Sequence, residues 1–311
     1  MGRAIPAPVK FSSMVLAYAG LTLTIFFWSI NTVIARAVIL EIKPMTLSFY
    51  RWFLALIFIL PFALPYLKKD IKLIKQNIGF LFFLSIPSVA AYNSILYLGA
   101  QYTTATNISL VVATMPVMTI LFSWAMNKEK PFVLQTLGIM ISIFGVLVII
   151  SKGSWQVLTT LSFNPGDLLI VLSIASWAFY SVLLKKREIN ISPISFLTMI
   201  IFFGVLSILP FYLWEFSVFK GFELNSNNII IFLYLGIFPS ILSYLCWNFG
   251  VKTAGASIAS VFMYLLPVFT SIIAYFFLDE NLFFYHFTGG WLILFGLIMS
   301  SQKQTTDSNR G

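Results

Sequence analysis

Ten long apolar runs cover almost the whole of this 311-residue chain. Each run is close to the length of about 20 residues that a helix needs to cross the hydrocarbon core of a bilayer. The runs are continuous and show no alternation of polar and apolar residues, so we expect helices and not barrel strands. The sequence therefore predicts an all-α integral membrane protein with ten transmembrane helices, at residues 15–35, 45–67, 77–98, 104–126, 133–151, 166–185, 193–214, 228–250, 255–278 and 283–301.

The composition agrees with a membrane protein and argues against several other classes. Hydrophobic residues make up 59% of the chain and charged residues 9%, with a mean hydropathy of +0.95, whereas soluble domains carry about 25% charge. No G-x-x-x-x-G-K-[ST] loop is present to bind nucleotide phosphates, so an ATP-driven pump would need a partner chain. With one histidine, one cysteine and no acid deep inside a span, a catalytic or metal-binding constellation is nearly impossible to assemble. We therefore expect no enzyme activity, no cofactor and no metal site.

The basic residues indicate how the chain is oriented in the membrane. If the amino terminus is cytoplasmic, 14 of the 19 Lys and Arg fall in inner segments, 4 fall in outer segments, and Arg51 lies within a span. Inner loops of membrane proteins carry such an excess of Lys and Arg. The sequence thus predicts that both termini are cytoplasmic. This topology explains the basic pI of 9.6 without nucleic acid as a partner.

The two halves of the chain repeat each other. The word ILPF occurs at 59–62 and again at 208–211, and the same offset of 149 relates Trp28 to Trp177. At an offset of 151, the chain aligns Pro116 with Pro267, Glu129 with Glu280, Gly138 with Gly289 and Gly145 with Gly296. Each half has an odd number of spans, so the halves enter the membrane from opposite sides and form an inverted repeat, as in many secondary transporters. We expect a cytoplasmic tail at 1–14, a first repeat at 15–151, an external connector at 152–165, a second repeat at 166–301 and a cytoplasmic tail at 302–311.

Four segments carry a family resemblance. They are FFWSINTVIARAV at 26–38, YRWFLALIFILPF at 50–62, ATNISLVVATMPVMTILFSWAMNKE at 105–129 and ASIASVFMYLLPVFTSIIAYFFLDE at 256–280. In these segments, and in the glycine-bearing fifth span of each half, the chain resembles the EamA type of the drug/metabolite transporter superfamily. The resemblance implies ten helices, cytoplasmic termini, a central cavity between the halves, and packing through the fifth and tenth helices. It also implies transport of small metabolites, and a place in the cell inner membrane.

Aromatic and amide side chains cluster at helical spacing on six of the expected spans. Residues three or four apart share one helix face, and a buried amide within lipid needs a partner, so these faces should point inward. A cavity lined in this way suits a small amphipathic or zwitterionic solute, and the alternative is an interfacial belt of Trp and Tyr. Together with Arg51, the candidate substrate-binding residues are Trp28, Asn31, Tyr92, Asn93, Asn107, Trp177, Tyr180, Tyr244, Trp247, Asn248, Ser257 and Tyr264.

Arg51 is the one ionised group placed several residues inside a span, where a charge costs at least about 2.5 kcal/mol unless it is paired or hydrated. It is expected either to bind a substrate carboxylate or phosphate or, in the interpretation that we favour, to reach the headgroups or tie helix ends together. Asp167 sits at the start of a span and His286 is expected at the surface, so neither offers the buried group that a proton relay needs. We therefore favour facilitated diffusion or exchange over obligate proton coupling, and sodium coupling stays open.

The function predicted from the sequence is a secondary carrier that works by alternating access, with amino acids or amino-acid derivatives as the expected substrates. The alternative is a lipid or amphipathic-drug flippase or exporter of the same fold. The expected partners are a small-molecule substrate and membrane lipids, and the protein is expected to be a monomer or a homodimer. The paired glycines are expected to pack helices closely and not to bind a ligand.

Overall fold

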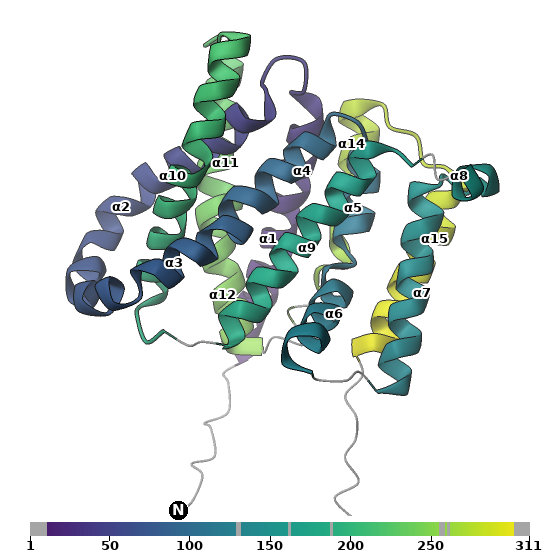
Figure 1. Cartoon of the computed structure of the whole chain (residues 1–311), viewed down its shortest axis with the longest axis horizontal. Helices are drawn as coiled ribbons and strands as arrows, with labels where there is room; N and C mark the ends of the chain where they lie inside the picture. Colours follow the sequence, from purple (N-terminus) through teal and green to yellow (C-terminus); the bar gives the residue numbers. More distant parts are fainter. Residues whose placement is uncertain are drawn as a thin grey trace, which may run out of the picture.

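The computed structural model describes residues 11–128, 132–160, 163–186, 189–254, 259 and 262–301, and these residues form helices without any strand. Short connections join the helices (Figure 1). In chain order the elements are α1 (Phe11–Ala37), α2 (Pro44–Gln76), α3 (Ile78–Ser85), η1 (Ile86–Ala91), α4 (Tyr92–Ala100), α5 (Ala105–Val112), α6 (Met115–Asn127), α7 (Val133–Ile150), α8 (Trp155–Thr160), α9 (Pro165–Lys186), α10 (Pro193–Phe219), α11 (Ser226–Ile237), η2 (Phe238–Leu242), α12 (Ser243–Ala254), α14 (Leu265–Leu278) and α15 (Phe284–Ser301).

The helices have the length and hydropathy of a multi-pass membrane protein. Seven helical stretches of the described chain could each cross a membrane, and an eighth results if α5 and α6, which are bent by 42° at their junction, are counted as one broken span. The helices α14 and α15 are apolar but shorter. Helices occupy every range in which a span was expected, although residues 255–258, 260 and 261 of the ninth range lie outside the described residues. The all-helical prediction is confirmed.

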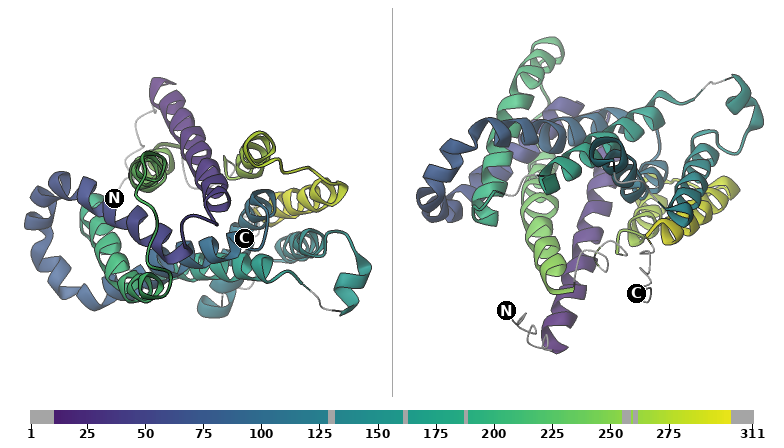
Figure 2. Two further views of the ribbon diagram at one scale, coloured as in Figure 1. Left: turned by 90° about the horizontal axis from the view of Figure 1, so that it is seen from above. Right: turned by 60° about the horizontal axis from the view of Figure 1, so that its bottom comes forward.

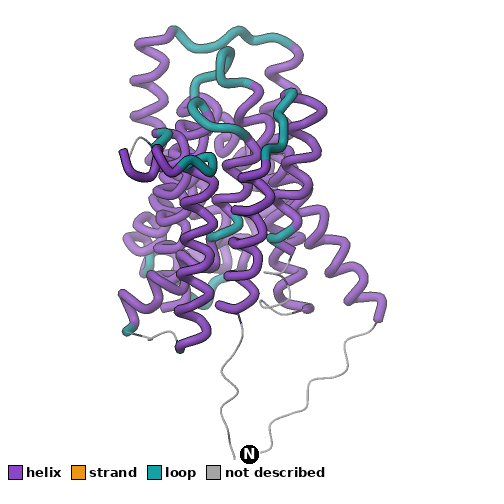
Figure 3. Tube along the Cα trace, turned by 90° about the vertical axis from the view of Figure 1, so that its right-hand side faces the viewer, coloured by secondary structure: helices purple, strands orange, loops and turns teal. Residues whose placement is uncertain are grey.

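The ends of the helices define two faces, named the lower and the upper face after their positions in Figure 1. The start of α1 and the end of α15 lie at the lower face. Between the faces, α1 packs against α12 and α14 (Figure 2), and Figure 3 shows most of the helices running from one face to the other. The upper face carries the connections at 38–43, 101–104, 220–225 and 279–283.

Helices α2 and α10 are tied together at both ends by carboxylates. Glu215, near the end of α10, accepts hydrogen bonds from the backbone N–H groups of Met45 (3.1 Å) and Thr46 (2.7 Å) at the start of α2. Asp70, near the end of α2, accepts one from the backbone N–H of Ser192 (2.9 Å), the residue that precedes α10. The first N–H groups of a helix have no partner within the helix and favour a negative charge. Each of the two helices thus supplies the anion that completes the start of the other.

Two π-helical segments interrupt the helices at equivalent places in the two halves. Pro87 in η1 and Pro239 in η2 are 152 residues apart. Because proline lacks an N–H and clashes with the preceding turn, it favours a widened turn. The carbonyl of Pro239 accepts a hydrogen bond from the indole N–H of Trp28 in α1 (3.1 Å), and that of Pro87 accepts one from the hydroxyl of Ser176 in α9 (2.9 Å). The widened turns therefore anchor α1 and α9 in the same way.

Helices α7 and α15 pack backbone to backbone, side by side at the right of Figure 1. A Cβ atom added at Gly138 would lie 2.5 Å from the carbonyl oxygen of Gly296, and one added at Gly145 would lie 2.8 Å from that of Gly289. Small residues allow helices to approach this closely within a membrane. The prediction that these glycines pack helices is confirmed for this pair.

Candidate substrate-binding cavity

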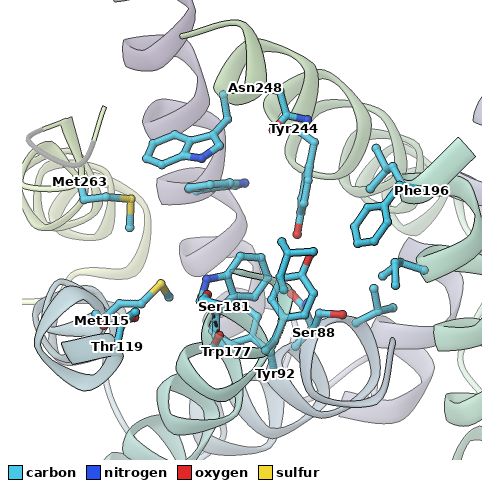
Figure 4. A pocket seen from close by; sticks show the side chains of 18 of the residues that line it. Ser88, Tyr92, Met115, Thr119, Trp177, Ser181, Phe196, Tyr244, Asn248 and Met263 are labelled. Carbon is cyan, nitrogen blue, oxygen red and sulfur yellow. Dashed lines mark hydrogen bonds between the residues drawn. The ribbon is translucent and has the colours of Figure 1, made fainter. Parts of the chain in front are cut away.

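A cavity of about 1540 Å³ lies among helices of both halves of the chain. Its wall includes residues of α1, α2, η1, α4, α5, α6, α9, α10, α12 and α14, and side chains converge on it from several of these helices (Figure 4). The exposed residues Asn190 and Lys252 belong to this wall, so the cavity reaches the surface at the lower face. Ligand pockets usually measure about 300–1,000 Å³. The cavity therefore has room for a small organic molecule together with water.

Ten of the thirteen candidate residues lie together in the wall of the cavity. Asn107 instead points into a separate polar cluster with Asp167 and His286 at the upper face, and Tyr264 is half-buried at the start of α14, outside the lining. Ser257 lies outside the described residues. The residues that the structure brings together are Trp28, Asn31, Arg51, Tyr92, Asn93, Trp177, Tyr180, Tyr244, Trp247 and Asn248.

Part of the wall escaped the sequence reasoning. Met115 and Thr119 of α6, Phe196 of α10 and Met263 also line the cavity (Figure 4). The three apolar residues carry no signal that separates a cavity wall from a surface that faces lipid, and the Thr119 hydroxyl can be satisfied within its own helix, as its bond to the Met115 carbonyl shows (2.9 Å). Only the spatial arrangement of the helices identifies these residues.

Two aromatic pairs face the cavity from different helices. The ring centroids of Trp28 in α1 and Tyr244 in α12 are 6.3 Å apart, and those of Trp177 in α9 and Tyr92 in α4 are 5.0 Å apart. The tryptophans are 149 residues apart in the sequence and the tyrosines are 152 apart, so the two pairs are repeat equivalents. Such rings offer apolar surface to an organic solute and a negative π-face to a cation.

Arg51 lies in the same wall and is 3% exposed. Its Nε donates to the hydroxyl of Ser240 (2.8 Å), and its Nη1 donates to Asn93 Oδ1 (2.7 Å), to the Tyr97 hydroxyl (2.8 Å) and to Asn31 Oδ1 (3.1 Å). The arginine therefore does not reach the headgroups, which corrects one part of the interpretation that we favoured, whereas its contacts agree with the other part, a link between helices. It joins α2 to α1, α4 and η2, because their neutral oxygens surround the guanidinium at the depth of the cavity.

The guanidinium retains capacity for a ligand. Nη2 makes one long contact, 3.5 Å to the carbonyl of Pro239, although this nitrogen carries two hydrogens. All the hydrogen-bond partners that the described residues give to Arg51 are neutral, and a buried charge without a counter-charge is costly. A carboxylate or phosphate on a ligand would supply that counter-charge in a geometry that suits a guanidinium.

A second polar cluster lies at the upper face, away from the cavity. Asp167 is 0% exposed and His286 is 5% exposed, and both are hydrogen-bonded to Asn107. The expectation that His286 lies at the surface is wrong, because α15 turns its imidazole toward α5. The expectation that Asp167 offers no buried group is wrong as well, because its carboxyl at the start of α9 is covered by neighbouring helix ends. The sequence places Asp167, Asn107 and His286 near the ends of three different spans, but nothing in it indicates that these ends meet.

Comparisons with known proteins match this chain to one family model and to several transporters. The profile of the EamA-like transporter family matches the chain twice, over residues 15–151 and 164–302. An uncharacterized transporter of Archaeoglobus fulgidus is 27% identical over 291 residues, which cover 91% of this chain and 96% of the relative. The uncharacterized transporter YyaM of Bacillus subtilis is 30% identical over 238 residues, which cover 75% of this chain and 76% of YyaM.

A solved structure supports the fold. A crystal structure described only as that of a protein superimposes with a TM-score of 0.59 at 15% sequence identity. The superposition covers 93% of this chain and 97% of that chain. At this level of identity the likeness concerns the path of the backbone and not the ligand.

Proposed function

Because this chain belongs to the EamA-like transporter family, we propose that it is a secondary transporter of a small metabolite that works by alternating access. The cavity is the observation that carries this proposal, because it collects Arg51, amide groups and the two aromatic pairs and reaches the surface at the lower face. We place the protein in the cell inner membrane, with both termini in the cytoplasm. The lower face is then cytoplasmic.

The proposed architecture is ten spans in two inverted repeats, at residues 15–151 and 166–301, joined by an external connector at 152–165. The two matches of the family profile support it. The equivalent π-helical segments and the equivalent aromatic pairs support it as well, because each relates one half of the chain to the other. Inverted repeats give a transporter two nearly equivalent states, one open to each side.

The described conformation corresponds to the state that is open at the lower face and closed at the upper face. Closure of the upper face is supported by Arg36, whose Nη1 donates to the carbonyls of Ala100 (3.0 Å) and Gln101 (3.1 Å). It is also supported by Glu280, which accepts hydrogen bonds from the backbone N–H groups of Ala105 (2.7 Å) and Thr106 (3.0 Å) at the start of α5. Opening the upper face requires these contacts to break.

The substrates that we propose are amino acids or amino-acid derivatives. Arg51 suits the carboxylate of such a molecule, and the aromatic pairs suit an ammonium group or an apolar side chain. The neutral amide oxygens and hydroxyl groups of the wall add hydrogen bonds that fix orientation. A zwitterion would thus find a complementary group for each of its charges.

Counterflow in proteoliposomes tests this proposal. Vesicles are preloaded in turn with pools of amino acids, nucleosides, sugars and organic acids, and uptake of a radiolabelled member of each pool is followed without an ion gradient. We expect accumulation for the amino-acid pool, and at least a severalfold loss when Trp177 is replaced by alanine. The matched control is Trp214→Ala, because Trp214 is 63% exposed on α10 and lies outside the cavity. Accumulation for another pool alone would contradict the substrate class, and silence for every pool with folded protein would contradict carrier action by exchange.

The size of the cavity favours one alternative, a flippase for lipids or amphipathic drugs. A volume of about 1540 Å³ is more than one amino acid needs, and an aromatic groove beside Arg51 could hold a phosphate headgroup. Quenching of fluorescent phospholipids by a membrane-impermeant reductant separates the two functions. Protein-dependent quenching of the inner-leaflet label, in vesicles that show no counterflow, would favour the flippase.

A further inference from the structure

The carboxyl group of Asp167 is buried and only half bonded. Asp167 lies in the first turn of α9 at the upper face and is 0% exposed. Its Oδ1 accepts hydrogen bonds from the Thr103 hydroxyl and from the Asn107 amide nitrogen (3.5 Å). Its Oδ2 is equally buried but has no hydrogen-bond partner among the described residues. Because an ionised oxygen that is buried without a donor is energetically unfavourable, Oδ2 is the position for one more ligand.

The histidine beside this carboxyl is neutral and donates away from it. The backbone N–H of Phe283 donates to His286 Nδ1 (2.9 Å), so the ring hydrogen is on Nε2, which donates to Asn107 Oδ1 (3.1 Å). This arrangement turns the Asn107 amide nitrogen toward Thr103 (3.3 Å) and Asp167. Every donor that reaches the carboxyl is therefore uncharged.

No charged group of the described residues forms an ion pair with this carboxyl. Lys152 is exposed and acts on Asp167 only through space, without a hydrogen bond to it. Glu280 carries a second negative charge, and both Glu280 and Asp167 interact electrostatically with Tyr285. The titratable and charged groups that act on or contact this cluster are Lys152, Tyr285 and His286. Arg36 and Glu280 bind the segments on either side of Thr103, at the carbonyls of Ala100 and Gln101 and at the start of α5.

The upper face is hollowed beside the start of α9. A hollow of about 340 Å³ is lined by Tyr102, Lys152, Asn164 and Pro165, so it borders the turn that leads into Asp167. Asn164 closes that turn, since its side chain donates to the carbonyl of Tyr102 (2.7 Å) and accepts from the backbone N–H of Gly166 (2.7 Å). A small rearrangement of this turn would connect Asp167 with the hollow.

We propose that Asp167 is a proton-binding site of the upper gate, an inference that rests on the proposed transport function. Oδ2 binds a proton when the upper face closes and releases it to the upper solution when that face opens. The proton joins a lone pair of the carboxylate oxygen and cancels its charge, and no other bond forms or breaks. Closure of the upper face thus takes up one proton, so acid on that side favours the described conformation.

Infrared spectroscopy of the full-length protein in lipid tests the site without any substrate. A protonated carboxyl has a carbonyl stretch that a carboxylate lacks. At neutral pH we expect the wild-type protein to show one such band, which shifts slowly in heavy water because the group is buried. Asp167→Asn should remove the band, and Asp167→Glu should shift its frequency. The glutamate variant still tests the assignment if the asparagine variant fails to fold.

The matched control is Asp279→Asn, which removes an exposed carboxyl from the same face and should leave the band unchanged. Asp279 has a φ of 52°, a conformation that asparagine tolerates. Absence of the band from the wild type at neutral pH would overturn the proposal, because the carboxyl would then be ionised. The proposal would also be overturned if sodium chloride removed the band at constant pH and choline chloride did not, because Asp167 would then bind sodium.

Counterflow at varied pH tests the gate. The pH is changed on one side of the membrane at a time. Acid on the upper side should lower the counterflow rate of the wild-type protein by up to about tenfold per pH unit, which is the limit for a single coupled proton. Asp167→Asn should lose this dependence and Asp279→Asn should keep it. Equal responses of the wild type and Asp167→Asn would refute the gate. If no variant shows counterflow, the proposed transport function fails, whereas the infrared band still decides whether Asp167 binds a proton.

Discussion

The contact between α7 and α15 gives a quantitative prediction for Gly138→Ala. The new Cβ would lie 2.5 Å from Gly296 O and 2.6 Å from Ser300 N, whereas non-bonded heavy atoms prefer about 3.5–4.0 Å. Both obstacles are backbone atoms, so no side chain can move aside and the helices must separate by about 1 Å. Overpacking of this kind costs about 1–3 kcal/mol. We expect Gly138→Ala to fall at the upper end of that range.

The partner glycine makes the prediction sharper. A Cβ at Gly296 would lie 2.4 Å from Gly138 O, so both alanines demand the same separation of the two helices. Once the first substitution has moved the helices apart, the second should cost little. The double variant should therefore be less destabilised than the sum of the single variants, by about 1–2 kcal/mol.

Unfolding in mixed detergent micelles, followed by circular dichroism, measures these free energies. The matched control is Gly79→Ala, because Gly79 is exposed in α3 and a Cβ there would have no neighbour within 4 Å. Alanine should stabilise that helix by about 0.5–1 kcal/mol through its helix propensity. The close approach of the two backbones would be refuted if Gly138→Ala left the free energy of unfolding unchanged. It would also be refuted if the changes caused by Gly138→Ala and Gly296→Ala simply added in the double variant.

Three further predictions concern the cavity and the helix ends. Arg51→Lys should raise the counterflow KM about 10–100-fold, because lysine keeps the charge but loses the fork that holds a carboxylate; an unchanged KM would remove Arg51 from the site. Asn31→Ala removes an acceptor of that guanidinium and should lower the counterflow rate without reducing membrane insertion. A wild-type rate would show that Asn31 is not part of the binding site. Glu215→Gln should lower the free energy of unfolding in micelles by about 1–3 kcal/mol, because charge-assisted bonds to the start of α2 are weakened; a loss confined to transport would contradict this cap.

The positions of the helices were predictable because lipid imposes a length and an apolar composition on each span. The breaks within spans were partly predictable: Pro87 and Pro239 lie in widened turns, but Pro116 lies just inside α6, after the α5–α6 break at residues 113 and 114. Sequence patterns assign a proline to a span, but they do not specify whether that span widens, bends or divides.

The lining of the cavity was predictable where amide and aromatic side chains recur at helical spacing. Such a face must turn away from lipid, as Trp28 and Asn31 do. The same reasoning placed Asn107 in the cavity, where it does not lie, because an inward-facing amide can meet either the cavity or a neighbouring helix. Asp167 and His286 gave no signal, since their burial depends on helix ends that are distant in the sequence and meet only in the folded protein.

The carboxylates that link α2 and α10 have a mechanical consequence. Asp70 fixes the start of α10 near one face of the membrane and Glu215 fixes the start of α2 near the other. Sliding one helix along the other by a single turn would detach both anions at once and expose N–H groups at both ends. The pair is thereby restrained against shear and should move as one rigid body. In the alternating-access cycle that we propose, the exchange of access between the two sides would then require the other helices to move relative to this pair.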